Sequence, residues 1–481
     1  MREVRLYNTL SRCVEGFYPL QEGLVGFYVC GPTVYDLIHI GNARVFVLFD
    51  ALRRFFETIG FQVRYVQNFT DIDDKIIDRA QQKGEEPRDL AERYIVEYFI
   101  DADRLGIKRA THHPRATEHI VDIIDLIRRL EGRGFTYRVA GDILFDTSRV
   151  DGYGKLSRKN PAELREGARV EARYRKNHPA DFVLWKMAKP GEPYWPSPWG
   201  EGRPGWHIEC SAMAAYYLGE TLDIHAGGCD LLFPHHENEV VQSEAASGRP
   251  FVRFWLHNGY LNIANEKMSK SLGNIMTVRE LLLRWKPETL RLVLLSTHYR
   301  NPINIDESVL AAAQRYVVKL ENLLRNFQFI RDRGRETTDT NDVERQFRER
   351  IEHLERYFLD TLTDDFNTPQ ALGVLSEFMR QANSYLEPKR GAWTGDSLRA
   401  IGDFLTLVQE ILGIIPPTPG DGQEQEIAAL VSQRGKAREG KEWSQADQIR
   451  KEITVRGYLV EDTPLGPRWY RNVEGSSFES F

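Results

Sequence analysis

The chain has 481 residues, of which 41% are hydrophobic and 28% are charged, and its formal net charge is −6. This length predicts three or four domains of about 100 to 200 residues, and the composition is typical of a globular protein. The charge excludes a uniformly basic nucleic-acid-binding protein. The sequence contains no run of about 18 apolar residues, so we expect no membrane span. Four scattered cysteines are too few for a disulfide framework, and no export signal opens the chain. We therefore expect a cytoplasmic protein without a membrane segment.

A strand-helix-strand unit comes first along the chain. The apolar run 24–30 predicts a strand, an apolar stripe at helical spacing predicts a helix that opens near Gly41, and residues 63–67 predict a second strand. In such a unit the helix N-terminus offers free N–H groups and the positive end of the helix dipole to phosphate. His39 and Asn42 stand beside this N-terminus as further donors. A lone motif of this kind is mostly chance, so it needs a second signal.

Short strand pairs and turn residues follow the first unit. Residues 135–138 and 143–145 predict two strands, and the Pro- and Gly-rich stretch 189–204 predicts loops. A second α/β stretch, 205–272, comes next, so the sequence predicts a nucleotide-binding fold that is split by an insertion.

Four potential metal ligands lie far apart in the sequence. Cys30 ends the first strand, Cys210 begins a helix of small residues, and His235 and Glu239 are four residues apart. Strand ends of a doubly wound sheet converge on one crevice, so these side chains can meet there. Two thiolates, one imidazole and one carboxylate suit zinc. Scattered cysteines are, however, more often buried small hydrophobic residues.

The spacing around the histidine pair predicts which ring faces the metal. Pro234 is well placed as the first residue of a helix. On that helix His235 and Glu239 share one face, whereas His236 points about 100° away.

The run Lys267-Met268-Ser269-Lys270-Ser271 supplies the second nucleotide signal. Its lysines would place mobile positive charge on the β- and γ-phosphates as negative charge builds on the leaving pyrophosphate. Gly273 and the serines would let the loop close and reopen. A lysine-serine run alone is usually a solvated turn. Its position downstream of the His39 motif in one α/β chain indicates activation of a carboxylate by ATP.

Long helices are predicted after residue 274. Asp306 is a plausible N-cap, the polar run 331–342 would be a loop between helices, and apolar residues at helical spacing continue to residue 415. Residues 416–422 form the clearest linker. Beyond it, residues 427–471 carry nine Lys and Arg against six Asp and Glu. This segment is either a positive face for a nucleic acid or a solvated helical domain.

The two motifs resemble the HIGH and KMSKS motifs of class I aminoacyl-tRNA synthetases. The resemblance covers nearly the whole chain and narrows to the cysteinyl-tRNA synthetases through four further blocks, residues 30–36, 68–75, 205–211 and 233–239. It implies a Rossmann-like doubly wound parallel sheet, split by a connective insertion and followed by an α-helical bundle and a small C-terminal module. With fewer than about eighty residues, the insertion leaves little room for an editing domain.

The resemblance also divides the chain. It implies a first catalytic half at 1–127, a connective insertion at 128–204, a second catalytic half at 205–275, a stem-contact region at 276–307, a helical bundle at 308–415, a linker at 416–426, an anticodon-binding module at 427–471 and a tail at 472–481.

The implied activity is ligation of L-cysteine to tRNA(Cys) through cysteinyl-adenylate, by a monomer with one Zn²⁺ per chain and Mg²⁺ bound with ATP. The zinc would recognise the substrate thiol. The resemblance assigns catalysis to His39, Asn42, Lys267 and Lys270; further ATP contacts to Gly31, Thr33, Gly41 and Asp230; cysteine contacts to Cys30, Gly31, Thr70, Trp206 and Asp230; and zinc ligation to Cys30, Cys210, His235 and Glu239.

Two other functions are compatible with parts of this pattern. A cysteine ligase of mycothiol biosynthesis shares the zinc site and both nucleotide motifs but should lack the C-terminal module. A zinc-stabilised tRNA-binding protein that has lost catalysis would not need His39. The sequence also leaves Cys229, His225 and His257 unassigned, and core packing is an alternative role for Trp206. Asp78 replaces the second lysine that family members with a persulfide side activity carry, which puts that activity in doubt.

Overall fold

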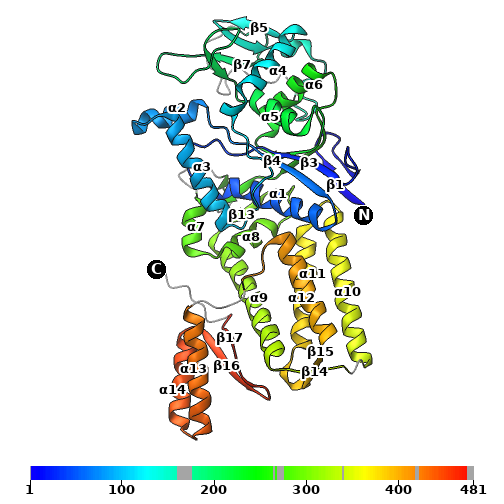
Figure 1. Ribbon diagram of the computed structural model, residues 1–481, viewed down its shortest axis with the longest axis vertical. Helices are drawn as coiled ribbons and strands as arrows, with labels where there is room; N and C mark the ends of the chain where they lie inside the picture. Colours follow the sequence, from blue (N-terminus) through cyan, green and yellow to red (C-terminus); the bar gives the residue numbers. More distant parts are fainter. Residues whose placement is uncertain are drawn as a thin grey trace. The chain divides into compact units, whose positions relative to one another are not determined.

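The structure is a computed structural model that describes residues 2–159, 176–263, 266–267, 276–338, 341–417 and 422–473 (Figure 1). It contains two compact units. The first unit comprises Met1–Arg284, His298–Asn304 and Thr363–Phe366, and the second comprises Trp285–Thr297, Ile305–Leu362 and Asn367–Phe481.

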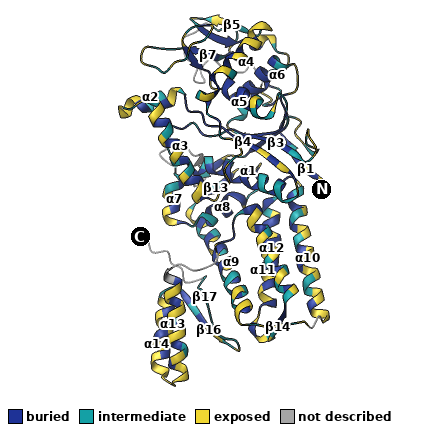
Figure 2. Ribbon diagram, viewed as in Figure 1, coloured by how far each residue is buried: buried dark blue, intermediate teal, exposed yellow. Residues whose placement is uncertain are grey.

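A four-stranded parallel sheet forms the centre of the first unit. Its order is β10-β9-β3-β4, with all neighbouring pairs parallel. The strands are almost wholly buried, as expected of a parallel sheet covered on both faces (Figure 2). The chain runs from β3 to β4 on one side, while β9 lies on the other side of β3, which creates the switch point where α/β sheets bind ligands. The strands are β3 (Leu24–Val29), β4 (Gln62–Gln67), β9 (Leu222–Gly228) and β10 (Val252–Asn258).

Helix α1 (Ile40–Thr58) connects β3 to β4 and begins where the sequence predicts it. Its buried face carries the predicted apolar stripe, Leu48, Leu52 and Phe55 among others, which packs towards the sheet. The further helices of this unit are α2 (Asp74–Lys83), α3 (Pro87–Arg104), α4 (Ile120–Gly132), α5 (Ile208–Leu218), α6 (Glu237–Ser247) and α7 (Val278–Arg284), with the short helices η1 (Ala116–His119) and η2 (Thr147–Arg149) and the π-helical turn η4 (Leu232–His236).

A separate antiparallel sheet lies in the region where the sequence predicts strand pairs. Its order is β5-β6-β7-β8, and its core of aromatic and aliphatic side chains packs with α4, α5 and α6. These strands are β5 (Thr136–Val139), β6 (Asp142–Phe145), β7 (Phe182–Met187) and β8 (Gly202–Pro204). The smaller strands are β1 (Val4–Asn8), β2 (Cys13–Phe17), β11 (Leu261–Ile263), β12 (Glu266–Lys267) and β13 (Ile303–Ile305).

The second unit is mainly helical. Phe358, Phe378 and Phe404 are fully buried in its core, and the last two rings are stacked with centroids 4.1 Å apart. Asp306 caps its longest helix, α9, as predicted, because its side chain accepts a hydrogen bond from the Val309 N–H. The helices are α8 (Pro287–Leu295), α9 (Glu307–Arg333), α10 (Asp342–Thr363), α11 (Thr368–Tyr385), η6 (Pro388–Arg390), α12 (Gly395–Leu412), α13 (Gly422–Glu439) and α14 (Trp443–Val455).

The run 331–342 connects two helices, α9 and α10, as predicted, but it is not entirely a loop. Helix α9 continues to Arg333, and β14 (Arg335–Thr337) then pairs in parallel with β15 (Ala392–Thr394). A polar segment therefore satisfies its backbone by strand pairing, which hydrophobic periodicity does not reveal.

The C-terminal hairpin of β16 (Tyr458–Thr463) and β17 (Gly466–Arg471) packs on α9. The Asn322 side chain accepts a hydrogen bond from the Arg471 N–H and donates one to the Arg471 carbonyl, both at 2.9 Å. The Arg325 guanidinium lies 4.5 Å from the centroid of the Trp469 ring. The segment beyond the predicted linker is thus held to α9 by specific polar contacts.

Candidate active site and metal centre

A cavity of about 1030 Å³ lies at the carboxyl ends of the parallel strands, within the first unit. It brings together residues that directly follow β3 and β4, residues of α1 and α5, and residues at the ends of β9 and β10. Among the residues predicted from the sequence, the cavity wall includes Cys30, Gly31, Thr33, His39, Gly41, Asn42, Thr70, Trp206, Cys210, Asp230 and His235. Glu239 is fully buried behind this wall.

The structure describes the two predicted lysines to different extents. The backbone of Lys267 lies in β12, where it pairs with Asn262. Lys270 and the rest of its motif lie outside the described residues. On either side of the motif, however, Leu261 and Thr277 both line the cavity, and the Ile40 N–H donates a 3.0 Å hydrogen bond to the Met276 carbonyl. Both flanks of the lysine motif therefore reach the cavity that His39 and Asn42 line.

His39 and Asn42 form a reciprocal cap at the start of α1. The Asn42 N–H donates to His39 Nδ1 at 3.1 Å, and the His39 N–H donates to Asn42 Oδ1 at 3.2 Å. Because Nδ1 accepts a hydrogen bond, a neutral His39 ring carries its proton on Nε2. Because Oδ1 is the acceptor, the Asn42 amide keeps its NH₂ group as a donor. The cap thus fixes two N–H donors beside a helix N-terminus, an arrangement suited to phosphate.

Gly31 is required by a close approach of two chain segments. A Cβ at this position would lie 1.6 Å from the Asn68 carbonyl oxygen, and the Gly31 N–H donates to Asn68 Oδ1 at 2.9 Å. Thr33 and Thr70 then form an isolated parallel bridge. The ends of β3 and β4 are held together in this way, and both segments face the cavity.

The four predicted metal ligands converge. The sulfur of Cys30 lies 3.9 Å from the sulfur of Cys210 and 3.7 Å from Glu239 Oε1, and His235 Nε2 lies 3.1 Å from the same oxygen. All four ligand atoms lie within 4.8 Å of one another and all four residues are buried. Tetrahedral ligands with bonds of about 2.0 to 2.3 Å stand roughly 3.3 to 3.8 Å apart. The observed spacing fits one zinc-sized ion.

Charge in this cluster is unevenly divided. A hydrogen bond from the Cys30 thiol lowers the pKa of Cys210 to about 6, whereas burial raises the pKa of Cys30. Burial disfavours charge on both Glu239 and His235. Neighbouring histidines nevertheless lower the pKa of Glu239 to about 2, and Glu239 with Cys210 raises the pKa of His235 to about 10. A thiolate and a carboxylate therefore point at the same buried spot, where a cation stabilises both.

Pro234 begins the helical backbone that leads into α6, as predicted, but the prediction that His236 turns away from the ligands is wrong. Phe233 is extended with φ −142° and ψ 131°, which kinks the chain just before Pro234, and helix α6 is assigned from Glu237. His236 Nε2 lies 3.3 Å from the sulfur of Cys30. Cys30, His225, His236 and Glu239 consequently form a second possible ligand set.

Histidines without a predicted role surround the ligands. His225 Nε2 lies 2.8 Å from Glu239 Oε2, and His207 Nδ1 lies 2.9 Å from His235 Nδ1. His236 Nδ1 is 2.7 Å from Nε2 of His257. Such outer contacts orient metal ligands. In the sequence, the feature that could have pointed to these residues is their clustering, because five of the 12 histidines fall between positions 207 and 257.

Beside the metal cluster, Trp206 forms an exposed wall of the cavity. Its relative exposure is 37%, which is inconsistent with core packing, and its ring lies 4.5 Å from that of His235. Lys75 Nζ lies 6.0 Å from the Trp206 ring. Thr70 is buried, and its hydroxyl donates to Glu209 Oε2 at 3.1 Å. Cys229 is half-buried outside the ligand cluster, and burial raises the pKa of its thiol to about 11.

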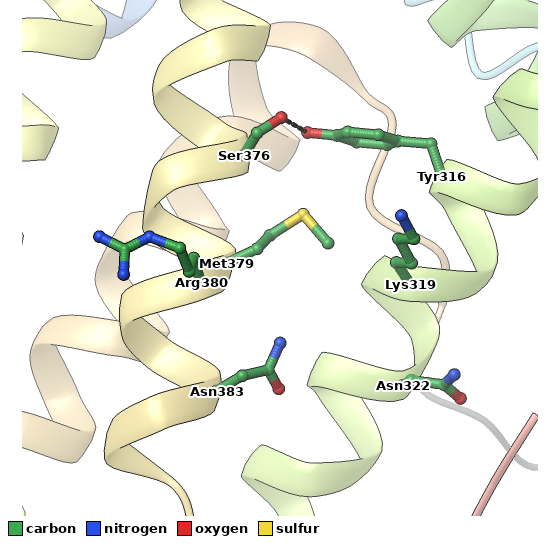
Figure 3. Close-up of a pocket in the computed structure, with 7 residues that line it drawn as sticks. All are labelled: Tyr316, Lys319, Asn322, Ser376, Met379, Arg380 and Asn383. Atoms are coloured by element: carbon green, nitrogen blue, oxygen red, sulfur yellow. Dashed lines mark hydrogen bonds between the residues drawn. The ribbon is translucent and has the colours of Figure 1, made fainter. Parts of the chain in front are cut away.

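A second concavity lies in the second unit, between α9 and α11 (Figure 3). Its volume is about 330 Å³, and Tyr316 and Ser376 join across it with their hydroxyl oxygens 3.0 Å apart. None of the residues predicted for catalysis or metal binding lines it. The chemistry therefore belongs to the cavity of the first unit.

Comparisons with known proteins agree with this geometry. Residues 16–315 match the family of tRNA synthetases class I (C) catalytic domains, and residues 357–415 match the DALR domain family. The cysteine–tRNA ligase of Caldicellulosiruptor saccharolyticus is 50% identical over 97% of this chain and 99% of its own length. The cysteine–tRNA ligase of a Geobacillus species is 48% identical over 98% of this chain and 100% of its own.

Solved structures show the same fold at low sequence identity. Mycobacterium tuberculosis methionyl-tRNA synthetase in complex with methionyl-adenylate aligns with a TM-score of 0.63 and 16% identity, over 85% of this chain and 94% of that one.

No helix among the described residues is long and apolar enough to cross a membrane. The chain belongs to the cysteine–tRNA ligases, a family of class I aminoacyl-tRNA synthetases.

Proposed function

We propose that the protein activates L-cysteine with Mg²⁺-bound ATP, forms cysteinyl-adenylate and transfers cysteine to tRNA(Cys), with one Zn²⁺ per chain that recognises the substrate thiol. The observation that carries the proposal is that one cavity has donors for phosphate at one end, at His39 and Asn42, and a buried cluster of soft ligands at the other.

The phosphate end supports adenylate formation without a protein nucleophile. The substrate carboxylate attacks the α-phosphorus and pyrophosphate leaves, so the protein has to position the reactants and stabilise charge. His39 Nε2–H, the Asn42 amide and the N-terminus of α1 supply fixed donors. Lys267 and Lys270, which the sequence motif assigns to the leaving phosphates, would supply the mobile charge. We place Gly31, Thr33, Gly41 and Asp230 around the nucleotide for the same reason, since all four line the cavity.

At the thiol end, Cys30, Cys210, His235 and Glu239 would hold the zinc. When bound, the metal offers an open position to a thiolate, for which a serine hydroxyl is a harder and far less acidic replacement. A ten-thousandfold preference for cysteine over serine corresponds to about 5.5 kcal/mol. A pocket that senses only shape seldom reaches this value for side chains of similar size. Thr70, Trp206 and Asp230 would complete the pocket around the amino acid.

The second unit supports a tRNA partner. Exposed basic side chains, among them Lys436, Lys441 and Arg450, lie on or between α13 and α14, and the preceding bundle matches the DALR domain. Such charges bind the phosphate backbone. We assign this module to the anticodon end of the tRNA and residues 276–307 to its acceptor stem, and we expect a monomer. The presence of this module weighs against a ligase of mycothiol biosynthesis, which should lack it.

Cysteine-dependent exchange of pyrophosphate into ATP, measured without tRNA, tests the proposal. We expect exchange with cysteine because both nucleotide motifs belong to the first unit. Exchange only with another amino acid would refute the assignment to cysteine. No exchange with any amino acid would favour a tRNA-binding protein without catalysis.

A further inference from the structure

Arg44 lies two residues beyond Asn42 on α1, lines the cavity and is almost completely buried, with 1% of its surface exposed. Its Nη1 atom donates to the carbonyls of Gly259 and Tyr260, both at 2.7 Å. Its Nη2 atom donates to the Asn301 carbonyl at 2.6 Å and to that of Tyr299 at 3.4 Å. One guanidinium thus holds two chain segments against the helix that carries the phosphate donors.

These two segments are themselves tightly joined. A Cβ on Gly259 would lie 2.5 Å from the Asn301 carbonyl carbon, and the Gly259 N–H donates to the Tyr299 carbonyl at 2.8 Å. The Tyr299 hydroxyl donates to Asp365 at 2.6 Å. The frame around Arg44 is therefore rigid, and the Asn258–Leu261 side of it forms part of the cavity wall.

Among the described residues, no carboxylate forms an ion pair with Arg44. Other arginines of α1 differ, because Arg53 pairs with Glu57 and Arg54 pairs with Asp50, each at 2.8 Å. Burial lowers the pKa of Arg44 to about 10, so the group remains charged at neutral pH. Burying a charge that only carbonyl dipoles balance costs free energy. A neutral donor such as an amide could bond the same carbonyls, so the hydrogen bonds alone do not require a charged side chain.

We infer that Arg44 is a buried positive charge that the phosphates of ATP neutralise, so that it contributes to nucleotide binding in addition to holding the cavity wall. The inference rests on the proposed function, because that function places a polyanion in this cavity. The simpler alternative is that Arg44 only anchors the two segments. The two roles separate experimentally, because one depends on the charge and the other on the hydrogen bonds.

Two substitutions divide the roles. Arg44→Gln keeps amide donors and removes the charge, whereas Arg44→Lys keeps the charge and loses the planar fork. Arg54→Gln is the matched control on the same helix, since Arg54 has its own carboxylate partner and does not line the cavity. The measurements are the KM values for ATP and cysteine in pyrophosphate exchange, together with the binding of ATP by calorimetry.

We expect Arg44→Gln to raise the KM and Kd for ATP at least about tenfold, which corresponds to ~1.4 kcal/mol, with the KM for cysteine changed less than about threefold. Arg44→Lys should keep the affinity for ATP within about threefold of the wild type even if its melting temperature falls. Arg54→Gln should leave both KM values unchanged.

An Arg44→Gln protein that binds ATP like the wild type would overturn the inference. If this variant does not fold, Arg44→Lys decides, because a loss of ATP affinity despite the retained charge would show that only the anchoring matters. Failure of the wild type to exchange pyrophosphate while it binds ATP would refute the proposed function. The calorimetric comparison of the variants would then still test Arg44.

Discussion

The two ends of the cavity are built in different ways. At the thiol end, four ligand atoms are already within 4.8 Å of one another on buried side chains, and outer histidines fix their orientation. At the phosphate end, fixed donors lie at the start of α1, and Leu261 and Thr277, which flank the lysine motif in the sequence, line the wall. The tasks that we propose for the two ends account for the difference. Selecting a thiol requires a preformed site, whereas charge on a leaving group appears only during the reaction.

Substitution of Cys210 by Ser should have the largest effect and should be confined to the thiol end. A serine oxygen is a poor zinc ligand at neutral pH, so metal content should fall and the preference for cysteine over serine should drop by orders of magnitude. The affinity for ATP should stay nearly unchanged. Metal analysis and exchange assays with both amino acids measure these effects.

Cys229→Ser is the control for this substitution, because Cys229 lies beside the cavity but outside the ligand cluster. It should keep both metal and selectivity. Full zinc content and full selectivity in Cys210→Ser would show that Cys210 is only a core residue.

Substitution of Lys270 by Ala should affect only the phosphate end. Removal of one transition-state charge contact commonly lowers kcat by about 10²- to 10³-fold. The KM for cysteine and the metal content should not change, since the lysine meets charge that grows only on the way to the transition state. Lys108→Ala, on the protein surface, serves as control. A change limited to the KM for cysteine would contradict this role.

Substitution of His225 by Gln tests whether the outer histidines organise the thiol end. The His225 ring bonds Glu239 at 2.8 Å, and His225 does not line the cavity. Loss of such an outer contact typically lowers metal affinity about 10- to 100-fold. Competition with a chelator measures this affinity. An unchanged metal affinity would mean that Glu239 is oriented without His225.

Deletion of the residues after Pro416 should have the smallest effect on the cavity. Cysteine-dependent exchange should stay within about threefold of the full chain, while tRNA charging falls because the basic module is lost. The deletion also removes the contacts of Arg471 with Asn322. A thermal melt therefore accompanies the assay, and equal loss of exchange and charging would indicate that the module is needed for folding.

The sequence predicted the parallel unit well, because α1 has a strong helical period and β3 and β4 are short apolar runs with clear ends. It also predicted many of the residues that line the cavity, since strand ends of such a sheet converge, whereas Lys270 lies outside the described residues. It failed at His236, whose ring lies 3.3 Å from the sulfur of Cys30 although the spacing on an ideal helix turns it away from the ligands. It also gave no role to Arg44 or His225, because their partners are backbone carbonyls and a distant carboxylate that only the fold brings near.

Removal of the metal from the wild-type protein tests most directly whether the two ends work separately. Calorimetry on one sample, before and after chelation, compares the binding of cysteine with that of ATP. We expect chelation to abolish cysteine binding and leave the Kd for ATP within about threefold, and added Zn²⁺ should restore cysteine binding. Unchanged cysteine binding in the metal-free protein, or an equal loss of both ligands, would contradict the account.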